Sequence, residues 1–238
     1  MKTHFYSIVL TLFSVASFGQ GKVYQNADFD IQKTNVKHHA NLSITVWSIT
    51  VKGTAGKTVP KKNGALNGAP VLGYVFPTSL KPTDVGFNQT EGIVALALTS
   101  HPDFDDTPLW DENNDQNYTN DGIVWHPHWV VLVKDERVKG GLSVKQFKKA
   151  DTTVVLPPTN PGMPMYMDSP GYPVTTKANT ISVIIPDYRM NHQLDFSYDG
   201  VTAYMTVNTS NENLPMLGVY EVFSISSGNL SLPNKVEK

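Results

Sequence analysis

Apolar and polar side chains alternate along several short segments of this chain, and the alternation has the two-residue period of a β-strand. The most regular segment is Asn41–Val51 (NLSITVWSITV), which is also rich in β-branched residues. The pattern predicts a strand there, with one face made by every second residue: Leu42, Ile44, Val46, Ser48 and Thr50.

Two other segments are continuously apolar: Gly92–Thr99 (GIVALALT) and Gly122–Val133 (GIVWHPHWVVLV). Short apolar runs of this kind are typical of strands that are buried on both faces. Pro127 interrupts the second run, and because proline has no backbone N–H we expect it at a sheet edge or a bulge. Shorter apolar stretches predict further strands at Val71–Phe76, Thr180–Ile185 and Gly218–Ile225.

A β-hairpin is predicted over Gln193–Val207 (QLDFSYDGVTAYMTV). Asp199 and Gly200 separate two alternating segments, and this residue pair favours the positive-φ turn of a hairpin.

The fold class follows from the number of these short segments. Gly- and Pro-rich turns separate them, no long amphipathic helix is predicted, and no repeat of 20–50 residues occurs. The sequence predicts an all-β protein: a single-domain antiparallel β-sandwich, or an open barrel, with long loops, over residues 20–238.

The first residues, MKTHFYSIVLTLFSVASFGQ, have the three parts of a secretory signal peptide. Lys2 begins it, Phe5–Phe18 is its apolar run, and small residues precede the expected cleavage near Gly19 and Gln20. The run is shorter than the ~20 apolar residues of a transmembrane helix, and no later segment is long and apolar enough to span a bilayer. We therefore expect residues 1–19 to be removed and the protein to be periplasmic or extracellular, with no transmembrane segment; a buried N-terminal helix or an uncleaved anchor is the alternative.

Charge is distributed unevenly, although the formal net charge is only −2. Residues 82–133 contain nine Asp and Glu and no Lys or Arg. We do not expect nucleic acid as a partner, because no basic stripe interleaved with aromatic residues occurs. The chain has no cysteine, which excludes disulfides and thiolate metal sites.

Within the acidic segment, DENNDQNYTND carries Asp or Asn at alternate positions. It resembles the beginning of the calcium loops of EF-hand, dockerin-like and thrombospondin-like proteins, and Ca²⁺ takes about six to eight oxygen ligands. Gln116 stands where the full EF-hand pattern has Gly, and Gly122 where it has Glu, so the resemblance implies an ion-binding loop and not an EF-hand domain. The alternatives are another cation, or a solvated loop held by Asx-turns. The expected Ca²⁺ ligands are Asp111, Asn113, Asp115, Asn117 and Asp121.

Three histidines predict a second metal site. His126 and His128 are two residues apart on one strand, so their side chains leave the same face about 6.5–7 Å apart. His101 follows the strand Gly92–Thr99, and pairing of the two strands would bring it towards His126. Three imidazoles, with Asp103 or Asp121 nearby, suit Zn²⁺, Cu²⁺ or Fe²⁺ and leave a coordination position for water. The alternative is a packed edge strand whose imidazoles bond carbonyls or the acidic loop.

Methionines alternate at Met163, Met165 and Met167, and thioethers spaced in this way can bind Cu(I). The alternative is that they fill gaps at a strand edge, because Met packs well into irregular spaces.

Three functions remain open from the sequence. The first is an exported metal-binding protein with a binding or structural role. The second is a metal-dependent hydrolase in which the histidines activate water and Asp103 or Asp106 is the general base. The third is a carbohydrate- or surface-binding module stabilised by calcium, with Trp110 contacting the ligand; Trp129 is expected in the core.

Overall fold

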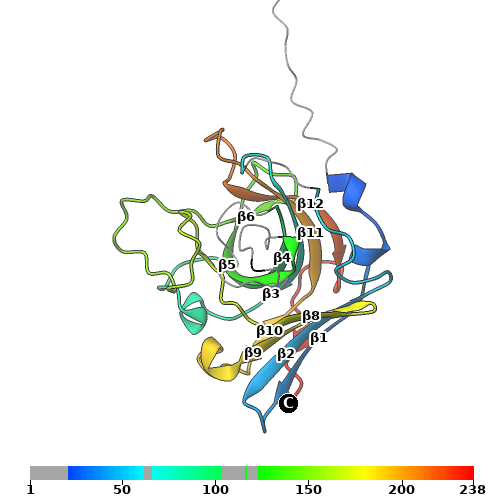
Figure 1. Ribbon diagram of the computed structural model, residues 1–238. Helices are drawn as coiled ribbons and strands as arrows, with labels where there is room; N and C mark the ends of the chain where they lie inside the picture. The colour runs from blue at the N-terminus through cyan, green and yellow to red at the C-terminus, as the bar shows by residue number, and fades with distance from the viewer. Residues whose placement is uncertain (1–20, 62–65, 103–115, 117–122) are drawn as a thin grey trace, which may run out of the picture.

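A computed structural model of the chain describes residues 21–61, 66–102, 116 and 123–238. Its strands form one closed barrel, seen end-on in Figure 1, with an open four-stranded sheet packed against one side. The helical structure of the described residues is of the 3-10 type, and its turns include Gly21–Tyr24, Ala27–Phe29, Pro82–Val85 and Asp187–Met190. The predicted signal peptide and the predicted calcium ligands lie outside the described residues.

The barrel has six antiparallel strands, and pairing of β4 with β5 closes the ring. Around the barrel the order is β4 (Ile93–Ser100), β3 (Pro70–Pro77), β11 (Val201–Val207), β12 (Leu217–Ile225), β6 (Leu142–Val144) and β5 (His126–Lys134). The two-residue strand β7 (Met167–Asp168) pairs with β5 beside β6. The two continuously apolar segments of the sequence are therefore neighbours at the seam of the barrel.

Alternation along the barrel strands divides the buried residues into two clusters. On β4, Ala95 and Ala97 point into the barrel, whereas Leu96 and Leu98 point outward into a second core. This division explains why β4 and β5 are continuously apolar, since both of their faces are buried.

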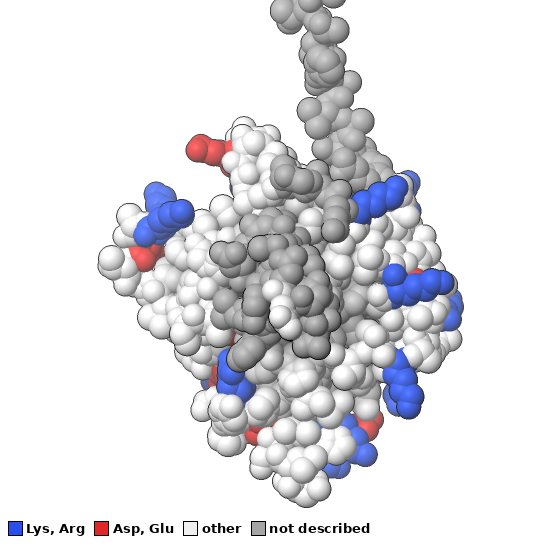
Figure 2. Space-filling model, viewed as in Figure 1, with Lys and Arg blue, Asp and Glu red and all other residues white. Residues whose placement is uncertain are grey.

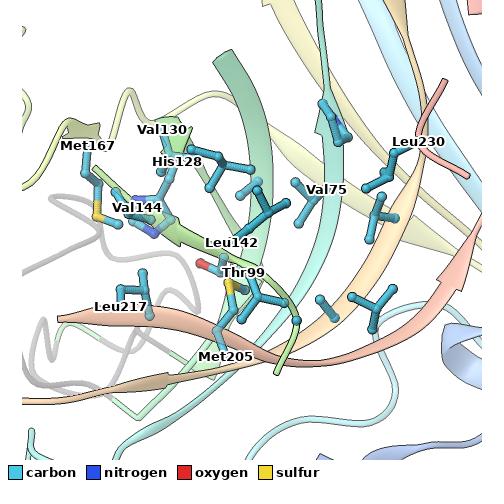
Figure 3. A pocket seen from close by; sticks show the side chains of 18 residues that line it. Val75, Thr99, His128, Val130, Leu142, Val144, Met167, Met205, Leu217 and Leu230 are labelled. Carbon is cyan, nitrogen blue, oxygen red and sulfur yellow. The ribbon is translucent and has the colours of Figure 1, made fainter. Parts of the chain in front are cut away.

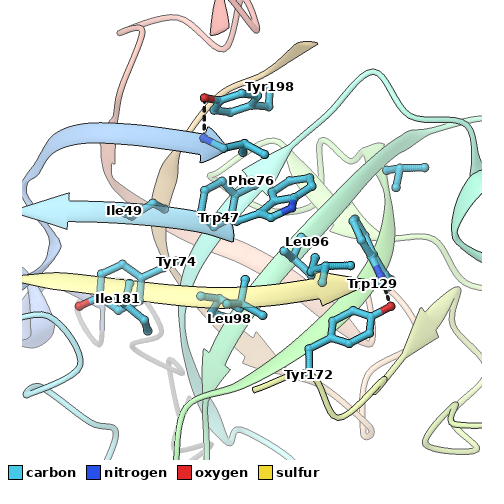
Figure 4. Packing of buried hydrophobic residues seen from close by; sticks show 14 of the residues in the cluster. Trp47, Ile49, Tyr74, Phe76, Leu96, Leu98, Trp129, Tyr172, Ile181 and Tyr198 are labelled. Atoms are coloured by element: carbon cyan, nitrogen blue, oxygen red, sulfur yellow. Dashed lines mark hydrogen bonds between the residues drawn. The ribbon is translucent and has the colours of Figure 1, made fainter. Parts of the chain in front are cut away.

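The second core lies between the barrel wall and the open sheet, which has the order β1 (Ile31–His39), β2 (Ile44–Val51), β9 (Thr180–Pro186) and β8 (Val174–Lys177). Trp47 of β2 is fully buried there, packed edge-on against Phe76 of β3 and Trp129 of β5 (Figure 4). The sheet thus braces the barrel with aromatic side chains. The face of β2 that the sequence pattern singled out (Ile44, Val46, Ser48 and Thr50) is only half-buried. The fully buried face is the opposite one, formed by Thr45, Trp47, Ile49 and Val51.

The predicted all-β fold is confirmed, and the strands predicted at the six apolar or alternating segments are present with ends shifted by up to four residues. The predicted hairpin is wrong. Ser197–Tyr198 (β10) pairs with Asn234–Lys235 (β13), and β11 pairs with β3 and β12. Asp199 and Gly200 join β10 to β11, and the Asp199 carboxylate accepts a hydrogen bond from the Ser227 backbone at 3.1 Å. Long-range pairing therefore overrides the local turn signal.

The basic side chains are spread over the surface. Figure 2 shows the described Lys and Arg side chains dispersed around the periphery of one face, and not gathered into a patch. In the part of the chain that the structure describes, no helix has the length and apolar character needed to cross a membrane.

Candidate metal centre

His101, His126 and His128 meet inside one end of the barrel. His126 and His128 are alternate residues of β5, and His101 directly follows β4. In the register of these strands, Thr99 lies opposite His126 and Ala97 opposite His128, so all these side chains share the inward face. The barrel seam therefore brings together three imidazoles from segments separated by a 25-residue interval.

One nitrogen from each of the three imidazoles lies within 4.8 Å of the other two. The Nε2 atoms of His101 and His126 are 3.0 Å apart. In a tetrahedral site with metal–nitrogen bonds of about 2.0–2.1 Å, ligand nitrogens are roughly 3.3 Å apart. The cluster is thus close to the dimensions of a single-ion site. All three residues are buried, with exposed fractions of 1–3%.

Each imidazole is held through its Nδ1 atom. His101 Nδ1 donates to the Pro102 carbonyl at 2.9 Å, and His126 Nδ1 donates to the Val124 carbonyl at 2.6 Å. His128 Nδ1 is 2.9 Å from the Ser169 hydroxyl. Partners of this kind fix the orientation of metal-binding histidines and leave Nε2 for coordination.

These hydrogen bonds determine where the ring hydrogens lie. A carbonyl oxygen can only accept, so Nδ1 carries the hydrogen in both His101 and His126. In the neutral form of each ring, Nε2 then carries a lone pair. The Nε2 atoms of His101 and His126 face one another at 3.0 Å, so both point to the place where a single ion could be held.

The surroundings also favour the neutral, metal-binding form of His126 and His128. Burial lowers the pKa of His128 to about 3, and the neighbouring His101 contributes in the same direction. Burial, with repulsion from His101 and His128, lowers the pKa of His126 well below its ordinary value. Metal ions bind neutral imidazole, so protons compete weakly for these two residues at neutral pH.

Two small cavities adjoin the triad inside the barrel. One, of about 30 Å³, is lined by His101 and His128 together with Met163, Met165 and Met167. The other, of about 60 Å³, has almost entirely apolar walls and extends from His128 along the barrel interior (Figure 3).

Thr99 contributes to both cavities. Its buried Oγ1 makes no hydrogen bond with any described residue, so it is a polar group that a bound molecule could reach. Both cavities are large enough to hold at least one water-sized molecule, which requires about 10–15 Å³ by the same measure.

The structure brings together the three predicted histidines and leaves the acidic part of the prediction untested. Asp103, Asp106, Trp110 and all five predicted Ca²⁺ ligands lie outside the described residues, which include only Gln116 from the interval 103–122. Trp129 is fully buried, as predicted, and Trp125 is 7% exposed.

Sequence reasoning missed Ser169 and Thr99 at this site. Ser169 reaches His128 only because β7 pairs with β5, and nothing in the residues around Ser169 indicates that pairing. Thr99 could have been found, since it is two residues before His101 on a strand with an inward-facing alternation.

Comparisons of the chain with protein-family models, with curated proteins and with solved structures find no match. The chemistry of the site is therefore argued from its geometry.

Proposed function

We propose that the protein binds one transition-metal ion through the Nε2 atoms of His101, His126 and His128. The observation that carries this proposal is the approach of His101 and His126 Nε2 to 3.0 Å, while both Nδ1 atoms are held by carbonyl oxygens. A nitrogen of a third imidazole, that of His128, lies within 4.8 Å of the other two, as ligands of one ion would.

The proposed role is binding of the metal, with a coordination position left for a further ligand. Three nitrogen ligands suit Zn²⁺, copper and Fe²⁺ and leave at least one position for a molecule from outside the triad. The adjoining cavities lie on the barrel-interior side of His128, which gives such a ligand a place to reside.

The experiment is elemental analysis of the purified protein after reloading with Zn²⁺ or copper and removal of loosely bound ions. We expect one ion per chain in the wild type and less than a tenth of that in His126→Ala and His128→Ala. His39→Ala is the matched control, because His39 is half-buried on the open sheet at the end of β1. Equal metal content in all four proteins would refute the proposal.

A second candidate function is a metal-dependent enzyme for a small, largely apolar substrate. The observation that favours it is the 60 Å³ cavity beside His128, whose only described polar side chains are His128 and Thr99. For a hydrolase, the general base proposed from the sequence is Asp103 or Asp106. Loss of turnover in Asp103→Asn and Asp106→Asn with unchanged metal content would support that chemistry; turnover unaffected in both would remove it.

The remaining proposals concern residues beyond the described part. Ca²⁺ bound at Asp111, Asn113, Asp115, Asn117 and Asp121 is supported by their alternate spacing alone. If the two sites are separate, His126→Ala removes the transition metal and leaves Ca²⁺ in place. Sugar binding through Trp110 is tested by Trp110→Ala in a glycan-binding assay. Export is tested by N-terminal sequencing of the mature protein, with Gln20 as the expected first residue.

A further inference from the structure

Three methionines line the same small cavity as two of the metal-binding histidines. Met163, Met165 and Met167 share the 30 Å³ cavity with His101 and His128. Asp, Glu and Cys are absent from the described walls of this cavity. Apart from the histidines and the Thr99 hydroxyl, the described side chains that line this cavity are thioethers and hydrocarbon groups.

The backbone explains why the methionines face the triad. Met165 and Met167 belong to the barrel-interior cluster, whereas Tyr166 between them belongs to the outer core. Alternation of this kind places every second side chain on the inner face. Met163 packs against the same interior cluster, half-buried.

Strand pairing places Met167 diagonally across from His128. Met167 is the register partner of Val130, and Asp168 that of Trp129. His128 and Val130 are on one face of β5, so Met167 and His128 are same-face diagonal neighbours. Figure 3 shows the Met167 thioether directed towards the His128 imidazole.

We infer that the ion held by the triad is monovalent copper, and that a thioether of the 163–167 segment completes its coordination. This inference depends on the proposed metal site and names the ion it selects. Thioether sulfur is a soft ligand that favours Cu(I), whereas Zn²⁺ gains little from it and prefers nitrogen, oxygen and thiolate. In a chain without cysteine, methionine supplies the soft donor.

The competing explanation is that the methionines only fill space, which their flexible side chains do well. Leucine separates the two explanations, because Met→Leu keeps volume and apolar character while removing the sulfur, usually at a cost below about 1.5 kcal/mol. Met205→Leu is the matched control, because Met205 is buried in the same barrel and lines the larger cavity but not the smaller one.

The experiment measures Cu(I) affinity by competition with a chromophoric Cu(I) chelator, and Zn²⁺ affinity by competition with a Zn²⁺ indicator. The variants are Met163→Leu, Met165→Leu, Met167→Leu and the triple variant. We expect at least one single variant and the triple variant to lower Cu(I) affinity by about tenfold or more. Zn²⁺ affinity should change less than about threefold, and Met205→Leu should match the wild type for both ions.

The results that would overturn the copper inference differ from those that would refute the metal site. Unchanged Cu(I) affinity in the triple variant overturns the inference and leaves the three-histidine site intact. Binding of neither ion by the wild type refutes the proposed function itself. X-ray absorption of the Cu(I)-loaded wild type gives a further test if a variant does not fold, since a copper coordinated only by nitrogen or oxygen would also overturn the inference.

Discussion

Loading the triad with its ion should stabilise the whole protein, and the size of the effect can be calculated. An ion that binds only the folded state at 100 times its dissociation constant adds about 2.7 kcal/mol to the free energy of unfolding. For a chain of about this size, 1 kcal/mol raises Tm by roughly 2–4 °C. The expected increase in Tm on metal addition is therefore roughly 5–10 °C.

If the proposed site is correct, this gain requires all three imidazoles. The Nε2 atom of His126 lies 3.0 Å from that of His101, and His126 is 1% exposed, so its removal takes a buried ligand from the proposed site. In His126→Ala the metal-induced increase in Tm should fall to about 1–2 °C, since at 100 times the wild-type dissociation constant a hundredfold weaker site adds only about 0.4 kcal/mol.

The assay is a thermal melt followed by circular dichroism, with chelator-treated protein measured before and after addition of the ion at fixed concentration. His39→Ala controls for metal bound at surface histidines and should retain the full increase. An equal increase in wild type and His126→Ala, or no increase in either, would refute the assignment of the triad as the site.

Three further predictions follow from other parts of the fold. Hydrogen bonds from Arg137 lower the pKa of Asp135 from 3.8 to about 2, so between these pH values the unfolded state binds more protons and stability is lost as pH falls. The difference in the free energy of unfolding by urea between wild type and Asp135→Asn should therefore shrink from pH 5 to pH 2. A difference that stays constant would contradict this. Trp47→Ala removes a fully buried ring that donates to the Thr45 hydroxyl at 2.8 Å and should cost about 3–5 kcal/mol in urea unfolding, whereas a cost under 1 kcal/mol would contradict its place in the core. Ala97→Leu extends a side chain into the 60 Å³ cavity. We expect the wild type to bind xenon in ¹²⁹Xe NMR and the variant not to bind it, with metal content retained. Xenon binding that persists in the variant would show that the cavity lies elsewhere.

Much of the fold was predictable because the strands are specified locally. The continuous apolar character of Gly92–Thr99 and Gly122–Val133 indicates burial on both faces, and both segments are barrel strands with a core on each side. Closure of the barrel was not predictable. The contact between β6 and β12 consists of a single register pair, Gly218 with Ser143, and such a contact has no signal in the sequence.

The histidines of the candidate site were also predictable, because they lie on two strands that local patterns specify. The spacing of His126 and His128 sets their common face, and the pairing of sequential strands brings His101 to them. The contribution of Met167 and Ser169 depends on where a two-residue strand joins β5. Contacts formed between segments 40 residues apart are decided by packing of the whole chain, and local patterns do not contain that information.

If the triad binds an ion as proposed, its position at the β4–β5 seam links ion binding to the assembly of the barrel. His101 belongs to one side of the seam and His126 and His128 to the other, so a bound ion joins two strands whose connecting segment is 25 residues long. A slip of one residue between these strands would turn one side's imidazoles outward. The proposed ion would therefore stabilise only the correct alignment of the two strands. Because the entropic cost of closing a loop grows slowly with its length, a longer or shorter connecting segment would change this stabilisation little.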